Sequence, residues 1–232
     1  MATLNLLCAG AAQGLVVALQ ERFKASTGAV VHGRFGAVGA MKEALLAGAP
    51  CDVFIVTAAM IDALCAQGLL RSDGAATLGR VQTGIAVKSG QALPDISTPE
   101  ALKAALLAAD AIYFPDPLRA TAGIHFAGVM RQLGIFESLR PRFYTTPNGA
   151  AAMRELRSAA TPQPIGCTQV TEINFSPGVQ IVAALPKPFE LATVYSAAVS
   201  TRAANSDLAL AFIALLAGAE SQPLRAAAGF ED

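Results

Sequence analysis

The stretch Gly36-Ala37-Val38-Gly39-Ala40-Met41, continuing through Ala47-Gly48-Ala49-Pro50-Cys51-Asp52-Val53-Phe54-Ile55, decides the fold. Its pattern predicts the end of a strand, a small-residue loop, a short amphipathic helix, a turn at Asp52 and a buried strand. No side chain in the loop is large enough to keep a ligand away from the backbone N–H groups at the helix start. Because those groups have no partner within the helix, the loop predicts an anion site.

Strands and helices alternate along the rest of the chain, which predicts an α/β fold with mostly parallel sheets. We expect strands at 4–7, 29–35, 52–56, 79–88, 111–114, 142–145, 164–169, 179–185 and 193–199. We expect helices at 13–26, 38–47, 58–67, 98–109, 121–133, 148–158, 206–216 and 223–228, with Thr98 and Asn148 as N-caps. Since no long polar linker interrupts the pattern, we predict two lobes joined by two crossing strands. One lobe is discontinuous, with residues 1–82 plus 196–232, and the other holds residues 83–195.

The composition excludes several classes of function. Seventeen basic residues balance seventeen acidic ones, and no basic run is present, so we expect no nucleic-acid partner. The four cysteines form no CxxC pair and only two histidines accompany them, so we expect neither a metal site nor a cofactor. No apolar run reaches the ~20 residues that a membrane span needs. We expect a cytoplasmic protein, or a periplasmic one whose leader has been removed.

Several short motifs, taken in order, resemble the molybdate-binding protein family, which has the type II periplasmic binding fold. They are Phe23 with Thr27-Gly28, the run Gly48-Ala49-Pro50-Cys51-Asp52-Val53-Phe54, Asp116-Pro117 with Ala122-Gly123-Ile124, Ile165-Gly166 with Glu172, and the final Gly229-Phe230. The resemblance covers nearly the whole chain. It implies a two-lobed α/β fold with a ligand cleft between the lobes, and an anion as ligand.

The family's ligand positions can be placed on this sequence one at a time. Two loops of the family present serine hydroxyls to the oxyanion, and here they read Gly10-Ala11 and Ala37-Val38, without a hydroxyl. In the second lobe the resemblance implies backbone N–H donors at Ala122 and Gly149. Gln169 stands where the family has a tyrosine hydroxyl. A tetrahedral dianion must have its hydration replaced by hydrogen bonds, so the loss of hydroxyls disfavours molybdate.

Other residues near these positions suit an organic carboxylate. Arg34 and Arg119 would grip a carboxylate with a planar guanidinium, and Thr57 and Thr121 would add hydroxyls. We expect Asp52 to stabilise a turn instead of contacting ligand. Thr168, Gln169, Thr171 and Glu172 form a polar cluster after a buried strand, at the end of a strand where ligands gather in α/β sheets.

Three functions remain open. The first is a solute-binding protein that takes a small organic anion, most readily a di- or tricarboxylate. The second is an isomerase on the same scaffold, similar to aconitate isomerase, which moves a double bond by proton transfer, with His125, Glu172 or Cys8 as candidate base. The third is a molybdate-binding or other oxyanion-binding protein of an ABC transporter, whose permease would be its partner if the chain is exported.

Overall fold

The computed structural model describes residues 2–232 and divides into two compact units, which we describe separately. Unit 1 contains the residues up to Val81 and Thr193–Asp232, and unit 2 contains Gln82–Ala192. Strand β4 (Ala76–Lys88) leaves unit 1 at Val81, and strand β9 (Ala192–Val199) brings the chain back. The mixed α/β architecture predicted from the sequence is confirmed.

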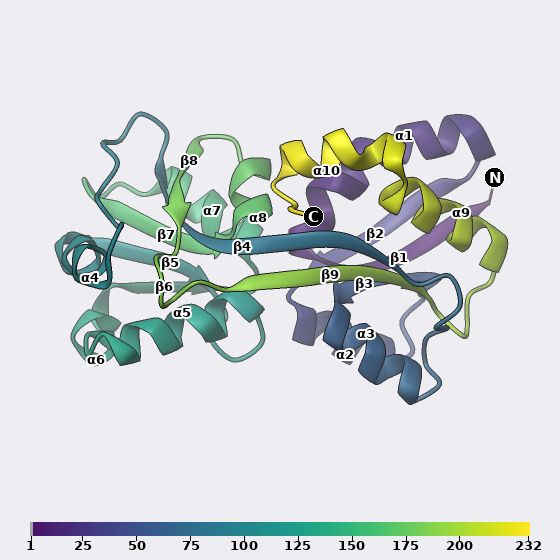
Figure 1. Ribbon diagram of the computed structural model, residues 1–232, viewed down its shortest axis with the longest axis horizontal. Coiled ribbons are helices and arrows are strands. Elements are labelled where there is room, and N and C mark those ends of the chain that lie inside the picture. Colours follow the sequence, from purple (N-terminus) through teal and green to yellow (C-terminus); the bar gives the residue numbers. More distant parts are fainter. Residues whose placement is uncertain (1) are drawn as a thin grey trace. The chain divides into compact units, whose positions relative to one another are not determined.

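The sheet of unit 1 is built around β1 (Thr3–Ala9), which pairs in parallel with β2 (Val30–Gly36) and β3 (Val53–Thr57). β9 pairs antiparallel with β3. One face is covered by α1 (Gln13–Thr27), α9 (Ser206–Ala217) and α10 (Gln222–Ala228), and the other by α2 (Val38–Leu46) and α3 (Ala58–Ala66), as Figure 1 shows. β1 is buried continuously from Leu6 to Ala9, and on the first face Phe23 of α1 makes an edge contact with Phe212 of α9 at 4.9 Å between ring centroids.

Asp52 has a structural role, but it connects distant segments instead of stabilising the local turn expected from the sequence. Its buried carboxylate accepts hydrogen bonds from Asn5 N at 2.7 Å, from Asn5 Nδ2 at 3.2 Å and from Ala204 N at 2.7 Å. Its backbone N–H donates to Asn5 O, and its carbonyl accepts from Ser200 N. Asp52 therefore ties β1 and the chain after β9 to the start of β3.

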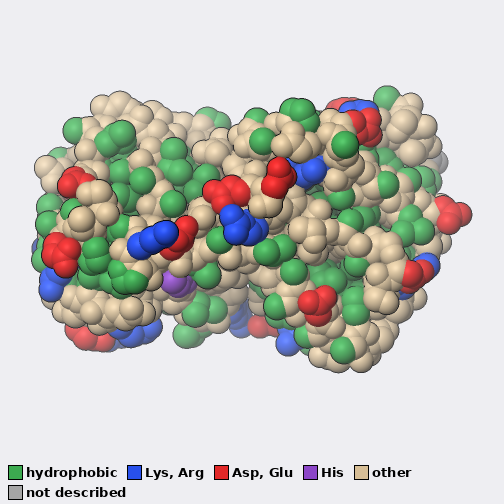
Figure 2. Space-filling view, viewed as in Figure 1, with side chains coloured by type: hydrophobic (Ala, Val, Ile, Leu, Met, Phe, Trp, Pro, Cys, Tyr) green, Lys and Arg blue, Asp and Glu red, His purple; other side chains and the backbone are tan. Residues whose placement is uncertain are grey.

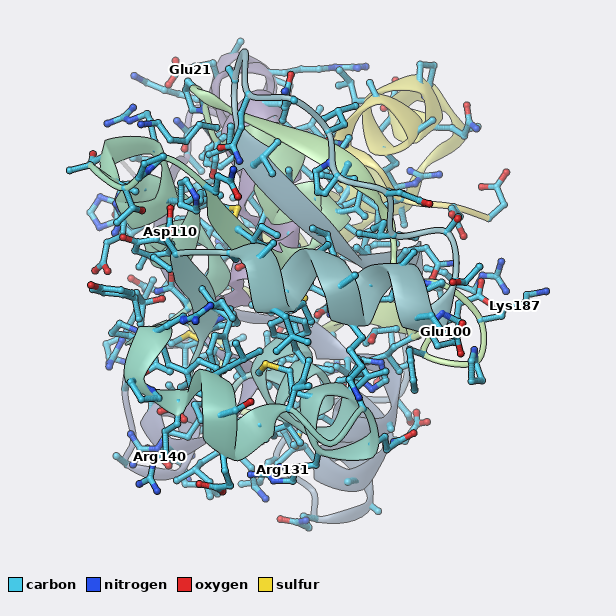
Figure 3. The ribbon with its side chains drawn as sticks, turned by 90° about the vertical axis from the view of Figure 1, so that its left-hand side faces the viewer. Glu21, Glu100, Asp110, Arg131, Arg140 and Lys187 are labelled. Carbon is cyan, nitrogen blue, oxygen red and sulfur yellow. The ribbon has the colours of Figure 1, made fainter. Side chains whose placement is uncertain are left out.

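The sheet of unit 2 contains three parallel strands, β5 (Ala111–Pro115), β6 (Phe143–Thr146) and β7 (Pro164–Gln169). β4 pairs antiparallel with β7 and with β8 (Val179–Ala184). The core on one face joins the sheet to α4 (Pro99–Ala108), α5 (Thr121–Gln132) and α6 (Phe136–Leu139). The core on the other face joins it to α7 (Gly149–Ser158) and α8 (Val170–Phe175). In Figure 3 unit 2 faces the viewer with α4 in front, and Glu100, Arg140 and Lys187 lie at the periphery.

The two N-caps predicted from the sequence are confirmed, whereas several short helices and turns were not predicted. Thr98 Oγ1 accepts from Ala101 N at 3.1 Å, and Asn148 Oδ1 accepts from Ala151 N at 2.9 Å. The sequence did not predict α6 or α8, and it placed the start of β4 at Gly79 instead of Ala76. The 3-10 turns η1 (Gly10–Ala12), η2 (Arg140–Arg142) and η3 (Ala219–Ser221) were also missed, because such short turns carry no periodic signal.

Two surface properties bear on function. On the face shown in Figure 2, basic and acidic side chains are interspersed and form no large patch of one sign. Across residues 2–232 no single helix has the length and apolar composition to cross a membrane. One pair bent by 52°, Ser206–Ala217 with Ala219–Ala228, meets both requirements only when its two helices are taken together.

Candidate functional site: uncapped helix starts at two strand edges

In unit 1 three parallel strands end at one edge of the sheet. The register pairs Ala9 with Gly36 and Cys8 with Ile55, so the carboxyl ends of β1, β2 and β3 lie side by side. At each end the chain turns directly into a helix, through η1 into α1, through Ala37 into α2, and through Thr57 into α3. This edge is where ligands collect in α/β sheets.

The starts of these helices present unused backbone donors. None of η1, α1, α2 and α3 has a side chain that caps its N-terminus. In α2, the first intrahelical bond is donated by Met41 N to Ala37 O at 3.0 Å, so the N–H groups of Val38, Gly39 and Ala40 come before it. Such groups, at the positive end of a helix dipole, favour an anion.

The side chains at this edge are small and mostly apolar. Gly10, Ala11, Ala37 and Val38 are all buried, and they were predicted to be ligand neighbours. The polar side chains in the segments 9–13, 36–40 and 57–60 are Gln13 and Thr57, both partly buried, and no charged residue occurs there. Thr57 therefore stands where the prediction placed it, at the end of β3. The sequence argument did not single out Gln13, whose signal is its position as the first residue of α1.

Two predicted residues of unit 1 lie elsewhere. Arg34 is exposed within β2 and lines a groove of about 440 Å³ with Asn5, His32 and Pro50, so it is not at the end of the strand. The reason is register, because Arg34 pairs with Leu7, two residues before β1 ends. Cys8 is fully buried, its Sγ donates to Ala9 O at 3.2 Å, and burial raises the pKa of its thiol far above the ordinary value. A thiol that stays protonated cannot accept a proton as a base.

In unit 2 the parallel strands β5, β6 and β7 also end at a common edge. β5 is followed by a loop that is held by Asp116, whose backbone N–H donates to Thr146 O at 2.8 Å and whose carboxylate accepts from Leu118 N at 2.7 Å. α5 then begins at Thr121 without a side-chain cap, and its first intrahelical bond runs from Ile124 N to Ala120 O. The N–H groups of residues 121–123 are thus the unit 2 counterpart of those at the start of α2.

Gly123 explains how closely this helix start approaches the strand. A Cβ atom at position 123 would overlap the carbonyl oxygens of Pro115 and Asp116. The first turn of α5 therefore packs directly on the end of β5. Ala122 is buried in the same turn and Thr121 is partly buried, as expected of residues that line a site.

Arg119 and His125 flank this helix start. Arg119 lies in the exposed loop before α5. His125 is half-buried one turn into α5, and its Nε2 lies 2.8 Å from Phe189 O. This contact holds the loop before β9 against α5, so one ring nitrogen already has a structural partner.

The carboxyl group of Glu172, a residue of α8, faces the first residues of α7. This carboxyl group is buried, and burial raises its pKa. The Thr168 hydroxyl, which donates to Glu172 Oε2 at 2.5 Å, and the backbone N–H groups of Ala150, Gln169 and Gly149 act in the opposite direction by stabilising the charged form. A Cβ at Gly149 would overlap Thr168 Oγ1 and Glu172 Oε2. The N–H of Gly149, predicted as a ligand donor, therefore already faces a carboxyl group of the protein itself.

Gln169 is buried at the end of β7, where it begins α8. Opposite it in the ladder lies Thr83 of β4, which the sequence argument did not identify. The hydroxyls of Thr83 and Thr171 are buried and find no hydrogen-bond partner within residues 2–232. Thr171 was part of the polar cluster noted in the sequence. Thr83 was hidden in an apolar strand, and its unpaired hydroxyl is visible only in the structure.

The described part of the chain offers no group of three or more His, Cys, Asp or Glu side chains placed to hold a metal ion. The polar atoms at the unit 1 edge are backbone N–H groups, the Gln13 amide and the Thr57 hydroxyl, whereas the unit 2 edge also carries the carboxyl groups of Asp116 and Glu172. Backbone N–H donors of this kind are able to bind an anion without the help of a charged side chain.

Comparison with known proteins agrees with this geometry. The periplasmic molybdate-binding protein of Azotobacter vinelandii has a TM-score of 0.80 and 20% identity, over 99% of both chains. The tungstate ABC transporter structure from Geobacter sulfurreducens has a TM-score of 0.69 and 16% identity, over 97% of both chains. At these identities the likeness shows the fold.

A curated relative adds sequence similarity. The aconitate isomerase of a Pseudomonas species is 24% identical over 225 residues, which is 94% of this chain and 84% of that protein. The family model described as bacterial extracellular solute-binding protein matches residues 4–231. The resemblance read from the sequence is thereby confirmed. Since this match spans nearly the whole chain, the protein belongs to the family of bacterial extracellular solute-binding proteins.

Proposed function

We propose that this protein binds a small organic anion, a di- or tricarboxylate, through backbone N–H groups at an uncapped helix start. The observation that carries the proposal is the set of uncapped helix starts whose first residues, Ala37 to Gly39 in unit 1 and Ala122 in unit 2, carry no large or polar side chain that competes for the donors. Each helix start offers several parallel N–H groups, which suits the two oxygens of a carboxylate.

The choice of an organic over an inorganic anion rests on what the unit 1 edge lacks. Ala11 and residues 37–39 provide no hydroxyl, so a tetrahedral dianion would lose hydration without full replacement. The side chains present instead, such as Ala11, Ala37 and Val38, are suited to the carbon skeleton of an organic acid. Gln13 and Thr57 supply polar contacts for a hydroxyl or second carboxylate.

A thermal-shift screen tests the proposal. The panel contains succinate, citrate and trans-aconitate, and for comparison the inorganic anions molybdate, tungstate, sulfate and phosphate, each tested separately. A ligand present at 100 times its dissociation constant should stabilise the fold by about 2.7 kcal/mol. We expect at least one carboxylate to raise the melting temperature and the inorganic anions to have a smaller effect. A shift with molybdate or tungstate alone would refute the carboxylate assignment.

A second candidate is an isomerase that acts on a carboxylate such as aconitate. The observation that favours it is the 24% identity to aconitate isomerase over nearly the whole chain. The reaction requires a base that removes a proton from one carbon and returns it to another while the double bond shifts, with no net redox change. Of the three candidate bases, Cys8 and Glu172 are buried, whereas His125 is partly exposed.

Proton NMR in deuterated water distinguishes binding from turnover. An isomerase would convert cis- or trans-aconitate and incorporate deuterium at the carbon that is reprotonated, and His125→Gln would abolish this exchange. A binding protein would shift the resonances of the ligand without new signals. Either result is compatible with the same anion donors, so the assay separates the two candidates.

The partner and the cellular location that we propose for this protein are inferred from its relatives alone. Since one structural neighbour is a tungstate ABC transporter component, we propose a permease of that transporter class as a partner if the chain is exported. Fractionation of the native host would test this. Detection in the periplasm supports transport, and detection in the cytoplasm only would contradict it.

A further inference from the structure

The hydroxyl of Thr83 is a buried donor without an acceptor. Thr83 is 0% exposed, and its Oγ1 has no hydrogen-bond partner within the described chain. The backbone around it is fixed on both sides, because Thr83 N donates to Leu191 O and Leu185 N donates to Thr83 O, both at 3.0 Å. The strand therefore holds the hydroxyl in place, and the group cannot turn outward to water.

The register places this hydroxyl on the α5 face of the unit 2 sheet. Thr83 pairs with Gln169, and two residues further along β4, Ile85 pairs with Cys167. Ile85 and Cys167 belong to the core that includes Phe126 of α5. Since side chains alternate along a strand, Thr83 and Gln169 share that face.

This position is at the carboxyl end of β7, the end of the sheet at which α5 begins. α5 is a helix of 12 residues with no side-chain cap, and the N–H groups of residues 121–123 precede its first intrahelical bond. Thus two independent features of unit 2, unused backbone donors and an unpaired buried hydroxyl, occur on one face at one end of the sheet. Buried polar groups that lack partners are rare in folded proteins and call for an explanation.

We propose that Thr83 is a ligand-binding residue whose Oγ1–H donates a hydrogen bond to a carboxylate of the ligand. Together with the Gln169 side chain it forms a polar subsite in unit 2. This inference rests on the proposed function. Through this hydrogen bond Thr83 helps to determine which carboxylate binds, because an apolar side chain at position 83 has no hydrogen to donate.

Three variants test the assignment. Thr83→Val replaces the hydroxyl by a methyl group of similar size, and Thr83→Ser keeps the hydroxyl. The matched control is Thr161→Val, since Thr161 Oγ1 is also buried without a partner among the described residues but lies in the loop that precedes β7, at the opposite end of that strand. Each variant is titrated by calorimetry with the carboxylate that stabilises the wild type most, and its unliganded melting temperature is measured.

We expect Thr83→Val to weaken binding by about tenfold or more, Thr83→Ser to stay within about threefold, and Thr161→Val to leave the affinity unchanged. Without ligand, both valine variants should melt at or above the wild-type temperature, because each removes an unpaired buried hydroxyl. This opposite effect on affinity and stability would not arise from a purely structural role. If Thr83→Val does not fold, Thr83→Ala repeats the test with a smaller side chain.

The outcomes separate the two proposals. If the wild type binds a carboxylate and Thr83→Val binds it within about twofold, the role of Thr83 is refuted while the proposed function stands. If Thr161→Val loses as much affinity as Thr83→Val, the effect reflects the fold and Thr83 has no specific role. If no carboxylate binds the wild type, the proposed function fails and the assignment of Thr83 fails with it.

Discussion

Replacing Val38 by proline removes a single candidate ligand donor and leaves the helix intact. Val38 is the first residue of α2, and its N–H precedes the first intrahelical bond, from Met41 N to Ala37 O. Proline is tolerated at this position because the missing N–H has no helical partner. Ala37, with φ −65° and ψ 149°, already has the extended conformation that a residue before proline adopts.

The expected loss follows from the bond that is removed. A hydrogen bond to a charged group contributes about 1.5–3 kcal/mol, so Val38→Pro should weaken carboxylate binding by roughly 10- to 150-fold at 1.4 kcal/mol per tenfold. Val38→Ala is the control, because it shortens the same side chain but retains the N–H. Calorimetry gives the dissociation constants, and far-UV circular dichroism confirms that the helix persists. An unchanged dissociation constant in a folded Val38→Pro protein would refute the role assigned to the start of α2.

Three further predictions concern the groups around the site. Gly149→Ala should destabilise the fold by about 1–3 kcal/mol in urea unfolding, since the added Cβ overlaps Thr168 and Glu172; stability equal to wild type would contradict the close packing. Asp52→Ala should cost about 1–3 kcal/mol, because the backbone N–H groups of Asn5 and Ala204 lose the acceptor of two part-buried hydrogen bonds, whereas the exposed Asp95→Ala should stay within about 0.5 kcal/mol. Burial raises the pKa of Glu172 above its unfolded value, so its contribution to stability is present below that value and is lost as pH rises through the folded pKa. The stability of the wild type relative to Glu172→Gln should therefore fall as the pH rises above the ordinary glutamate range, and a difference that is flat or rises would contradict this sign.

The parts of the fold that the sequence predicted are those governed by local signals. The N-caps Thr98 and Asn148 were correct because a capping side chain, its helix and the preceding loop are all adjacent in the chain. For Asp52, a polar residue just before a buried strand, the sequence predicted a local turn, whereas its carboxylate accepts hydrogen bonds from distant segments. Its partner Ala204 is distant in sequence and came only from the structure.

The parts that were missed depend on contacts between distant segments. α8 contains the β-branched Val170 and Thr171 and has no helical periodicity, so its conformation is set by packing against β8 and α7. Gly149 was expected to donate to a ligand, but Glu172, which is remote in sequence, already faces its N–H. Arg34 was expected near the site because it is close in sequence to Ala37, yet the register of β2 places it in a different groove. The Thr83 hydroxyl could be recognised as unpaired only in the structure, which shows that the groups around it bury it without accepting its hydrogen bond.

A head-to-head titration of the wild-type protein tests the central claim most directly. Isothermal calorimetry compares molybdate with citrate, succinate and trans-aconitate under one buffer condition. We predict that a di- or tricarboxylate binds more tightly than molybdate, because Ala11 and residues 37–39 offer N–H groups and apolar side chains without a hydroxyl for a tetrahedral dianion. Submicromolar binding of molybdate, at about 8.2 kcal/mol or more, with no measurable heat from the carboxylates would contradict the account.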